Sequence, residues 1–235
     1  MNIEPRYSLM SRIPATSLMI LLTGALLFVG CDSGGANGDG ANGGNGSNGS
    51  NGSGGESPTT KTVTDLPTDP AQPPSGGGRP QGTGRYTLFS LEDDEIVLEA
   101  SNNTRADSNS TKWDLGFQSI NVLVNNGEGG PGKAAAYVAK TAFQNINEAD
   151  TDKLSTSDAT NKELETDWYN YNTNGNNIVR PEAGRTIVVR TADGDSYAKI
   201  RMVSYYKGAP DEPSRDDDSR YYTFDHVVSD TPSFE

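Results

Sequence analysis

The first stretch that could do chemistry is the glycine-rich run at residues 127–133, GEGGPGK. Its glycines and final lysine have the spacing of a loop that cradles phosphates. Three residues argue against that chemistry. Ala134 stands where a phosphate loop needs Ser or Thr to bind Mg²⁺, Pro131 lacks a backbone N–H, and Glu128 adds negative charge. We therefore expect a surface loop and no nucleotide ligand.

Cys31 is the single cysteine of the chain, and it follows an uncharged apolar run at residues 18–29. That run is shorter than the roughly 20 apolar residues needed to span a bilayer, but it suits the apolar region of a signal peptide. It leads into Phe28-Val29-Gly30-Cys31, which has the order of a bacterial lipobox. The sequence predicts a signal peptide at residues 1–30 and attachment to the lipid bilayer through an acylated Cys31 thiol.

The next segment is predicted to be a tether. Residues 31–80 consist mainly of Gly, Asn and Ser at first and gain prolines toward the end. Such a segment buries too little apolar surface to offset its chain entropy. We expect a lipidated Cys31 followed by a disordered linker over residues 31–80, which carries a folded domain over residues 81–235.

The folded domain is predicted to be all-β. Its length suits one domain, and its apolar and β-branched residues alternate with period two. Asp193-Gly194 lies between two such runs and predicts a tight hairpin turn. Only two short segments, residues 134–140 and 160–169, resemble helices. The predicted strands are residues 86–91, 113–117, 120–124, 186–191, 197–206 and 221–228. Together they indicate an antiparallel sandwich or a related fold.

Charge and composition exclude several functions. The chain has 19 Lys and Arg against 32 Asp and Glu, a net charge of −13, which argues against nucleic acid as a partner. A hydrolase triad would have to use His226, the single histidine, as its base. Paired His or Cys spacings that would indicate zinc are missing from the sequence. We expect no catalysis and no structural metal.

Several motifs resemble the HmuY family of bacterial surface lipoproteins, whose best-known members bind haem. The matching stretches are WDLGF at residues 113–117 with the Asn/Gly-rich loop after it, WYNY at 168–171, GRTIVVRTADGDSYAKIRMVSYYKGA at 184–209 and YYTF at 221–224. The resemblance implies a nearly all-β HmuY-type fold and a location at the outer membrane or cell surface. It also implies haem as a cofactor and a TonB-dependent receptor as a partner.

The resemblance further implies haem-iron ligands, which in the best-known member are two histidines. This chain has only His226, and beyond the predicted signal peptide its single methionine is Met202. Both lie in predicted strands, where alternation favours packing in the core. A tyrosinate can also bind haem iron. The cofactor-binding candidates are therefore Tyr137, which follows the glycine loop, and His226. Trp168, Tyr169 and Tyr171 could form aromatic walls.

Two hypotheses follow. The first is a membrane-anchored surface lipoprotein with a HmuY-like ligand-binding domain that scavenges haem without a two-histidine clamp. The second is a non-haem structural or protein-interaction lipoprotein of the cell surface that retains the fold.

Overall fold

The computed structural model describes residues 58–72, 76, 81–102, 108–127, 129–156, 164, 166–171 and 177–235. The predicted signal peptide, Cys31 and the glycine-rich half of the predicted linker lie outside these residues. In the described segments, no helix has the length and apolar character needed to cross a membrane.

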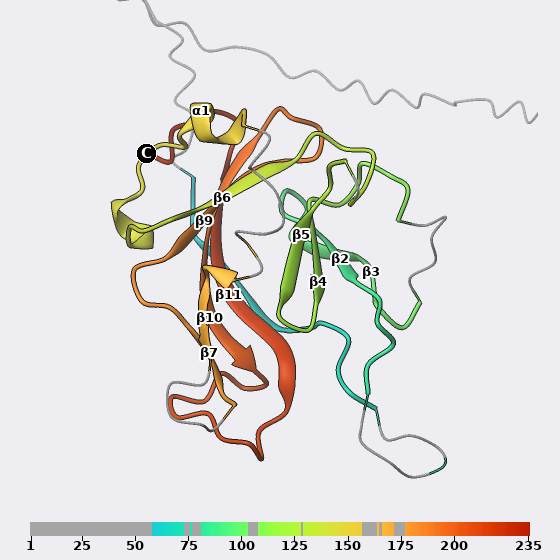
Figure 1. Cartoon of the computed structure of the whole chain (residues 1–235). Coiled ribbons are helices and arrows are strands. Elements are labelled where there is room, and N and C mark those ends of the chain that lie inside the picture. Colours follow the sequence, from blue (N-terminus) through green and yellow to red (C-terminus); the bar gives the residue numbers. More distant parts are fainter. Residues whose placement is uncertain are drawn as a thin grey trace, which may run out of the picture. The chain divides into compact units, whose positions relative to one another are not determined.

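The described residues form antiparallel β-sheets (Figure 1). The larger sheet has the strand order β1 (Lys61–Pro67), β11 (Ser219–Ser229), β10 (Tyr197–Tyr206), β9 (Thr186–Arg190) and β6 (Ala135–Ala139). The second sheet has the order β3 (Glu95–Leu98), β2 (Thr87–Ser90), β4 (Leu115–Gln118) and β5 (Asn121–Val124). A two-stranded ribbon pairs β7 (Tyr169–Tyr171) with β8 (Val179–Pro181). The helical segments include a 3₁₀ turn, η1 (Phe143–Asn145), and α1 (Thr151–Leu154), and Leu164 and Thr166 are also helical.

The all-β, antiparallel prediction is confirmed, and the hairpin after β9 shows why. Thr186–Arg190 is β-branched at most positions, which favours strand. The turn after it contains Gly194 at φ 89°, a conformation that glycine adopts without steric strain. Thr191 and Ser196 close the turn through a backbone hydrogen bond of 2.9 Å. The return strand β10 has the bounds predicted from the sequence.

An aromatic core lies between the two large sheets. Phe117 of β4 stacks on Phe224 of β11 with ring centroids 5.8 Å apart, and Phe89 of β2 meets Phe224 edge-on at 5.6 Å. Trp113, Leu115 and Phe117 are all fully buried, as their alternation predicts. Burial of this aromatic surface is the main force that holds the sheets together.

The other face of the five-stranded sheet carries a second, smaller apolar cluster. It is covered by η1, α1 and the C-terminal segment, and contains Tyr137, Val188 and Val227 with Phe143 and Phe234. The sheet is therefore buried on both faces over part of its area.

One prediction about secondary structure is wrong, and a second needs a new end point. Residues 134–140 were expected to be helical, but Ala135–Ala139 form the edge strand β6, which pairs with β9. Alanine gains at most about 0.7 kcal/mol per residue from helix over ordinary residues. Here Ala136 packs into one cluster and Tyr137 into the other, so burial on both faces outweighs propensity. In the second expected helix, residues 160–169, Leu164 and Thr166 are helical, whereas Tyr169 at its end begins β7.

The predicted domain boundary is also corrected. The folded domain was expected to begin at residue 81, but β1 begins at Lys61 and pairs with β11. Val63 lies opposite Phe224 and Leu66 opposite Tyr222, so the strand adds apolar contacts to the core. A register shift between Val63 and Leu66, with Asp65 at φ 54°, breaks the alternation that would reveal a strand.

Candidate functional site

The glycine loop that resembles a phosphate cradle is hydrogen-bonded to neighbouring parts of the domain. The buried side chain of Asn125 donates to the carbonyls of Ser110 (2.8 Å) and Trp113 (2.7 Å), and it accepts a bond from Gly132 N (2.9 Å). Lys133 N donates to Ala192 O at 2.7 Å. A Cβ at Gly132 would lie 2.6 Å from Asn125 O. The glycine thus permits close packing, and these amides are already used within the fold.

Asp114, within the WDLGF motif, links the two sheets. Its carboxylate accepts bonds from Leu91 N (2.8 Å), beyond β2, and from Ala192 N (2.7 Å), in the turn between β9 and β10. Burial raises the pKa of Asp114 to about 6, although these two backbone bonds partly oppose the shift. The role that the structure gives to this motif residue is to join the two turns.

His226 lies in the aromatic core. Its side chain is 0% exposed and packs against the rings of Phe224 (5.8 Å) and Phe89 (6.4 Å). Within the described residues neither ring nitrogen has a hydrogen-bond partner, and Nε2 lies 3.5 Å from Asp94 Oδ1. Burial lowers the pKa of His226, and the Asp94 carboxylate opposes part of this shift. The neutral ring is part of the core, as its alternation predicts.

Tyr137 lies on the opposite face of the same sheet. Across the sheet, Tyr137 pairs with Val188, and Val188 pairs with Lys199. Lys199 pairs with Val227, which is the neighbour of His226 along β11. Successive residues of a strand point to opposite faces. The Tyr137 hydroxyl accepts a hydrogen bond from Asp150 N at 3.0 Å, and burial raises its pKa. The two predicted ligand candidates are not brought together.

A cleft of about 490 Å³ opens beside β8 and the second half of β10, and we call it the arginine cleft. Its apolar lining includes Phe143, Met202, Val203, Tyr205 and Tyr206. Its cationic lining consists of Arg180, Arg185 and Arg201. Two acidic residues, Glu182 and Asp211, also belong to the lining, so that arginines outnumber carboxylates here in a chain with a net charge of −13.

The three arginines differ in their partners. Arg201 forms a two-donor ion pair with Asp225, through Nε at 3.0 Å and through Nη2. Arg180 meets Glu212 at 3.2 Å, and the Glu212 side chain is 90% exposed. The Nε of Arg185 is buried, and among the described residues it has no hydrogen-bond partner. A buried donor without an acceptor is unfavourable unless a ligand supplies one.

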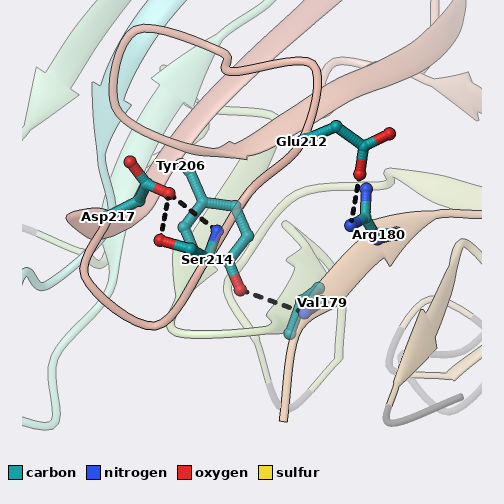
Figure 2. Close-up of polar contacts among 6 residues, drawn as sticks. All are labelled: Val179, Arg180, Tyr206, Glu212, Ser214 and Asp217. Atoms are coloured by element: carbon teal, nitrogen blue, oxygen red, sulfur yellow. Dashed lines mark hydrogen bonds and ion pairs between the residues drawn. The ribbon is translucent and has the colours of Figure 1, made fainter. Parts of the chain in front are cut away.

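A second cleft of about 470 Å³ adjoins the first, and we call it the tyrosine cleft. Tyr205, Tyr206 and Val179 line both clefts. Figure 2 shows the shared wall, in which Val179 N donates to the Tyr206 hydroxyl at 3.0 Å. Tyr171 lines the tyrosine cleft and Val203 the arginine cleft. They are 53% and 43% exposed, the large hydrophobic side chains most open to solvent in the described segments.

The loop over the clefts carries charged groups that Figure 2 also shows. Asp217 accepts bonds from the backbone N–H and the hydroxyl of Ser214, at 2.7 and 2.9 Å, which lower the pKa of its carboxyl. Glu212 reaches from this loop toward Arg180 on β8. The loop and the β7–β8 ribbon therefore border the same cleft.

A third cleft of about 520 Å³, the acidic cleft, lies over the β2–β3 turn. Its lining includes five carboxylates: Glu92, Asp93, Glu95, Asp114 and Asp193. Two of them accept hydrogen bonds from nearby residues: Asp193 from Thr191 Oγ1 (2.7 Å) and Asp195 N (2.9 Å), and Asp93 from Ser90 Oγ.

The arginines of the cleft were not among the predicted site residues. Arg180 lies on β8 and Arg185 follows that strand, whereas Arg201 comes from β10. The sequence held one signal for Arg201, because alternation with Ile200 and Met202 places it on the face away from the core. Of the predicted aromatic walls, Tyr171 lines a cleft, while Trp168 is 1% exposed and packs against Tyr222.

The fold and the clefts define an all-β protein with open clefts at its surface and an aromatic core. A family model described as HmuY protein matches residues 83–225. The chain belongs to the HmuY family, as its motifs indicate.

A solved structure also resembles the chain: the apo form of a HmuY analogue from Tannerella forsythia. The two share 15% sequence identity with a TM-score of 0.38, over 73% of this chain and 95% of the other. No curated protein matches this chain.

Proposed function

We propose that this protein is a lipid-anchored surface protein whose folded domain binds haem or a related porphyrin in the arginine cleft, without a two-histidine clamp. The observation that carries the proposal is the combination of three arginines with an aromatic and thioether lining in a member of the HmuY family. We further propose that it acts as a binding protein and not as an enzyme.

The cleft has the chemistry that a porphyrin requires. A porphyrin such as haem has a flat apolar ring and carboxylate groups at one edge. Tyr205, Tyr206 and Phe143 supply aromatic surface, and the unpaired Nε of Arg185 can donate to a carboxylate. The volume of about 490 Å³ is within the usual range for small-molecule sites.

The residues present do not fit a two-histidine iron site. The chain has one histidine, and it is buried in the core on the other side of the sheet from Tyr137. Met202 packs in the main core cluster, which leaves the tyrosines as the candidate iron ligands of the arginine cleft. Burial raises the pKa of the Tyr206 hydroxyl, which disfavours a tyrosinate. We infer that the ring and carboxylates provide the affinity, and that iron adds little.

The anchoring and partner proposals come from the sequence. An acylated Cys31 would hold the protein at the outer membrane or cell surface, and the segment up to residue 58 would act as a tether. A TonB-dependent receptor would accept the ligand. Replacement of Cys31 with serine should abolish labelling with radioactive palmitate and release the protein from the membrane fraction.

A titration tests the ligand proposal. The full-length protein, purified in detergent, is titrated with hemin and with iron-free protoporphyrin IX. We expect both to bind with 1:1 stoichiometry and affinities within about 3-fold of each other, since 3-fold corresponds to only about 0.7 kcal/mol. Binding of neither porphyrin by protein that circular dichroism shows to be folded would reject the proposal. A strong preference for hemin over protoporphyrin IX would show that a side chain of the protein coordinates the haem iron.

His226→Phe is the informative variant for the iron question. The ring lies among Phe89 and Phe224, so phenylalanine suits its surroundings. We expect hemin affinity to be unchanged in His226→Phe. Loss of hemin binding in the folded variant, with protoporphyrin binding retained, would identify His226 as an iron ligand.

A second candidate function is protein interaction without haem. Tyr171 and Val203 are exposed beside the clefts, and exposed aromatic and aliphatic residues are common at interaction sites. This alternative gains support if both porphyrins fail to bind while the domain remains folded.

A further inference from the structure

Arg201 is connected to the first strand of the domain through a chain of side chains. Its guanidinium donates from Nε (3.0 Å) and from Nη2 to Asp225 Oδ2. The other oxygen of Asp225 accepts a bond of 2.7 Å from Thr62 Oγ1, on β1. Thr62 lies opposite Asp225 in the sheet, and Asp225 lies opposite Arg201. The three side chains therefore share one face of three adjacent strands.

The guanidinium is also held from a second side. The Cζ of Arg201 lies 5.5 Å from the centre of the Phe143 ring, which contributes a cation–π contact. The Asp225 side chain is 11% exposed, whereas that of Arg201 is 51% exposed. Asp225 is thus a nearly buried anchor, and Arg201 presents its charge to the arginine cleft.

This arrangement leaves donors for a ligand. Arginine has five N–H donors, and Asp225 engages those at Nε and Nη2. The remaining donors belong to a half-exposed group that lines the cleft. Restricting the guanidinium before a ligand arrives reduces the ordering entropy lost on binding. Arg180 lacks this preparation, since its partner Glu212 is itself 90% exposed.

We propose that Thr62 is a positioning residue for ligand binding: through Asp225 it orients Arg201 to receive a carboxylate of the ligand. This inference rests on the proposed function, because the ligand must carry a carboxylate and occupy the arginine cleft. Thr62 lies before residues 83–225, which the family model matches. The strand nearest the predicted membrane tether would then take part in the binding site.

The test uses two variants of Thr62 and two ligands. Thr62→Val removes the hydroxyl with little change in shape, and Thr62→Ser retains the hydroxyl. The ligands are protoporphyrin IX and its dimethyl ester, which lacks both charges. We expect Thr62→Val to bind the diacid about 3- to 10-fold more weakly, as for loss of one hydrogen bond, and the ester within 2-fold of wild type. Thr62→Ser should restore diacid affinity, and Arg201→Gln should lose it selectively.

The outcomes separate this inference from the proposed function. If Thr62→Val binds the diacid as tightly as the wild type does, the positioning role of Thr62 is overturned. The proposal that the protein binds porphyrin would then still stand. Equal loss for diacid and ester would also overturn it, because β1 would then act only through stability. Failure of the wild-type protein to bind either ligand would reject the proposed function, and this inference with it.

Discussion

The arginine cleft and the acidic cleft have similar volumes, about 490 and 520 Å³, but they differ in how far the fold supplies hydrogen-bond partners for their charged groups. In the acidic cleft, Asp114 and Asp193 are bonded to nearby backbone amides. In the arginine cleft, the Nε of Arg185 is buried without an acceptor among the described residues. The comparison teaches that volume does not identify a ligand site. Polar groups that the fold leaves unsatisfied are more informative.

The largest expected effect belongs to the acidic cleft. Asp114→Ala removes the acceptor for two buried amides, those of Leu91 and Ala192. We expect a loss of about 3–5 kcal/mol in the free energy of unfolding, because each unsatisfied buried donor costs about 1–3 kcal/mol. Urea denaturation measures it. The exposed Glu95→Ala, in the same cleft, should change stability by less than about 0.5 kcal/mol. Similar small effects for both variants would contradict the structural role of Asp114.

The second effect is the pH dependence that Asp114 imposes. Its pKa is raised to about 6 in the folded protein, above the 3.8 of an ordinary Asp, so the folded state binds this proton more tightly. Its contribution to stability is therefore largest at low pH and is lost as the pH rises from about 4 to about 6. Relative to Asp114→Asn, the wild type should lose about 2 kcal/mol over this range, out of about 3 kcal/mol between about pH 3 and pH 7. Urea denaturation across the range measures the difference, and a difference independent of pH would contradict the raised pKa.

The third effect concerns the arginine cleft. Arg185→Gln removes the guanidinium group whose Nε has no acceptor. We expect at least about a 10-fold loss of porphyrin affinity, as for the loss of a charge-assisted hydrogen bond. Thermal stability should be nearly unchanged. Arg190→Gln is the matched control, because Arg190 is directed to the Lys133 carbonyl, away from the cleft. Equal affinity losses in both variants would indicate a general effect of charge rather than a specific anchor.

The smallest effect should be a gain. Glu212 forms an ion pair with Arg180, and its carboxylate is almost fully exposed. Such surface pairs contribute about 0–1 kcal/mol, so a ligand carboxylate can replace Glu212 easily. Glu212→Gln should raise porphyrin affinity about 2- to 3-fold. Asp216→Asn makes the same charge change in an exposed loop position outside the cleft and should leave affinity unchanged. A lower affinity in Glu212→Gln would show that Glu212 assists binding.

Most strands could be predicted because their signals are local. The return strand Tyr197–Tyr206 combines alternation with a turn at Gly194, and both follow from short-range geometry. β1 escaped prediction because a bulge at Asp65 interrupts its pattern and because its stability comes from β11, about 160 residues away. β6 was mistaken for helix because alanine favours helix until burial on both faces outweighs that preference.

The sequence by itself determined that the chain is acidic, has an all-β folded domain, is related to HmuY proteins and lacks a second histidine for a clamp. Composition and short-range patterns contain that information. Only the tertiary structure decided that Tyr137 and His226 lie on opposite faces of one sheet, and that Arg180, Arg185 and Arg201 surround one cleft. These relations depend on strand register and on loops that pack together, which no local pattern specifies.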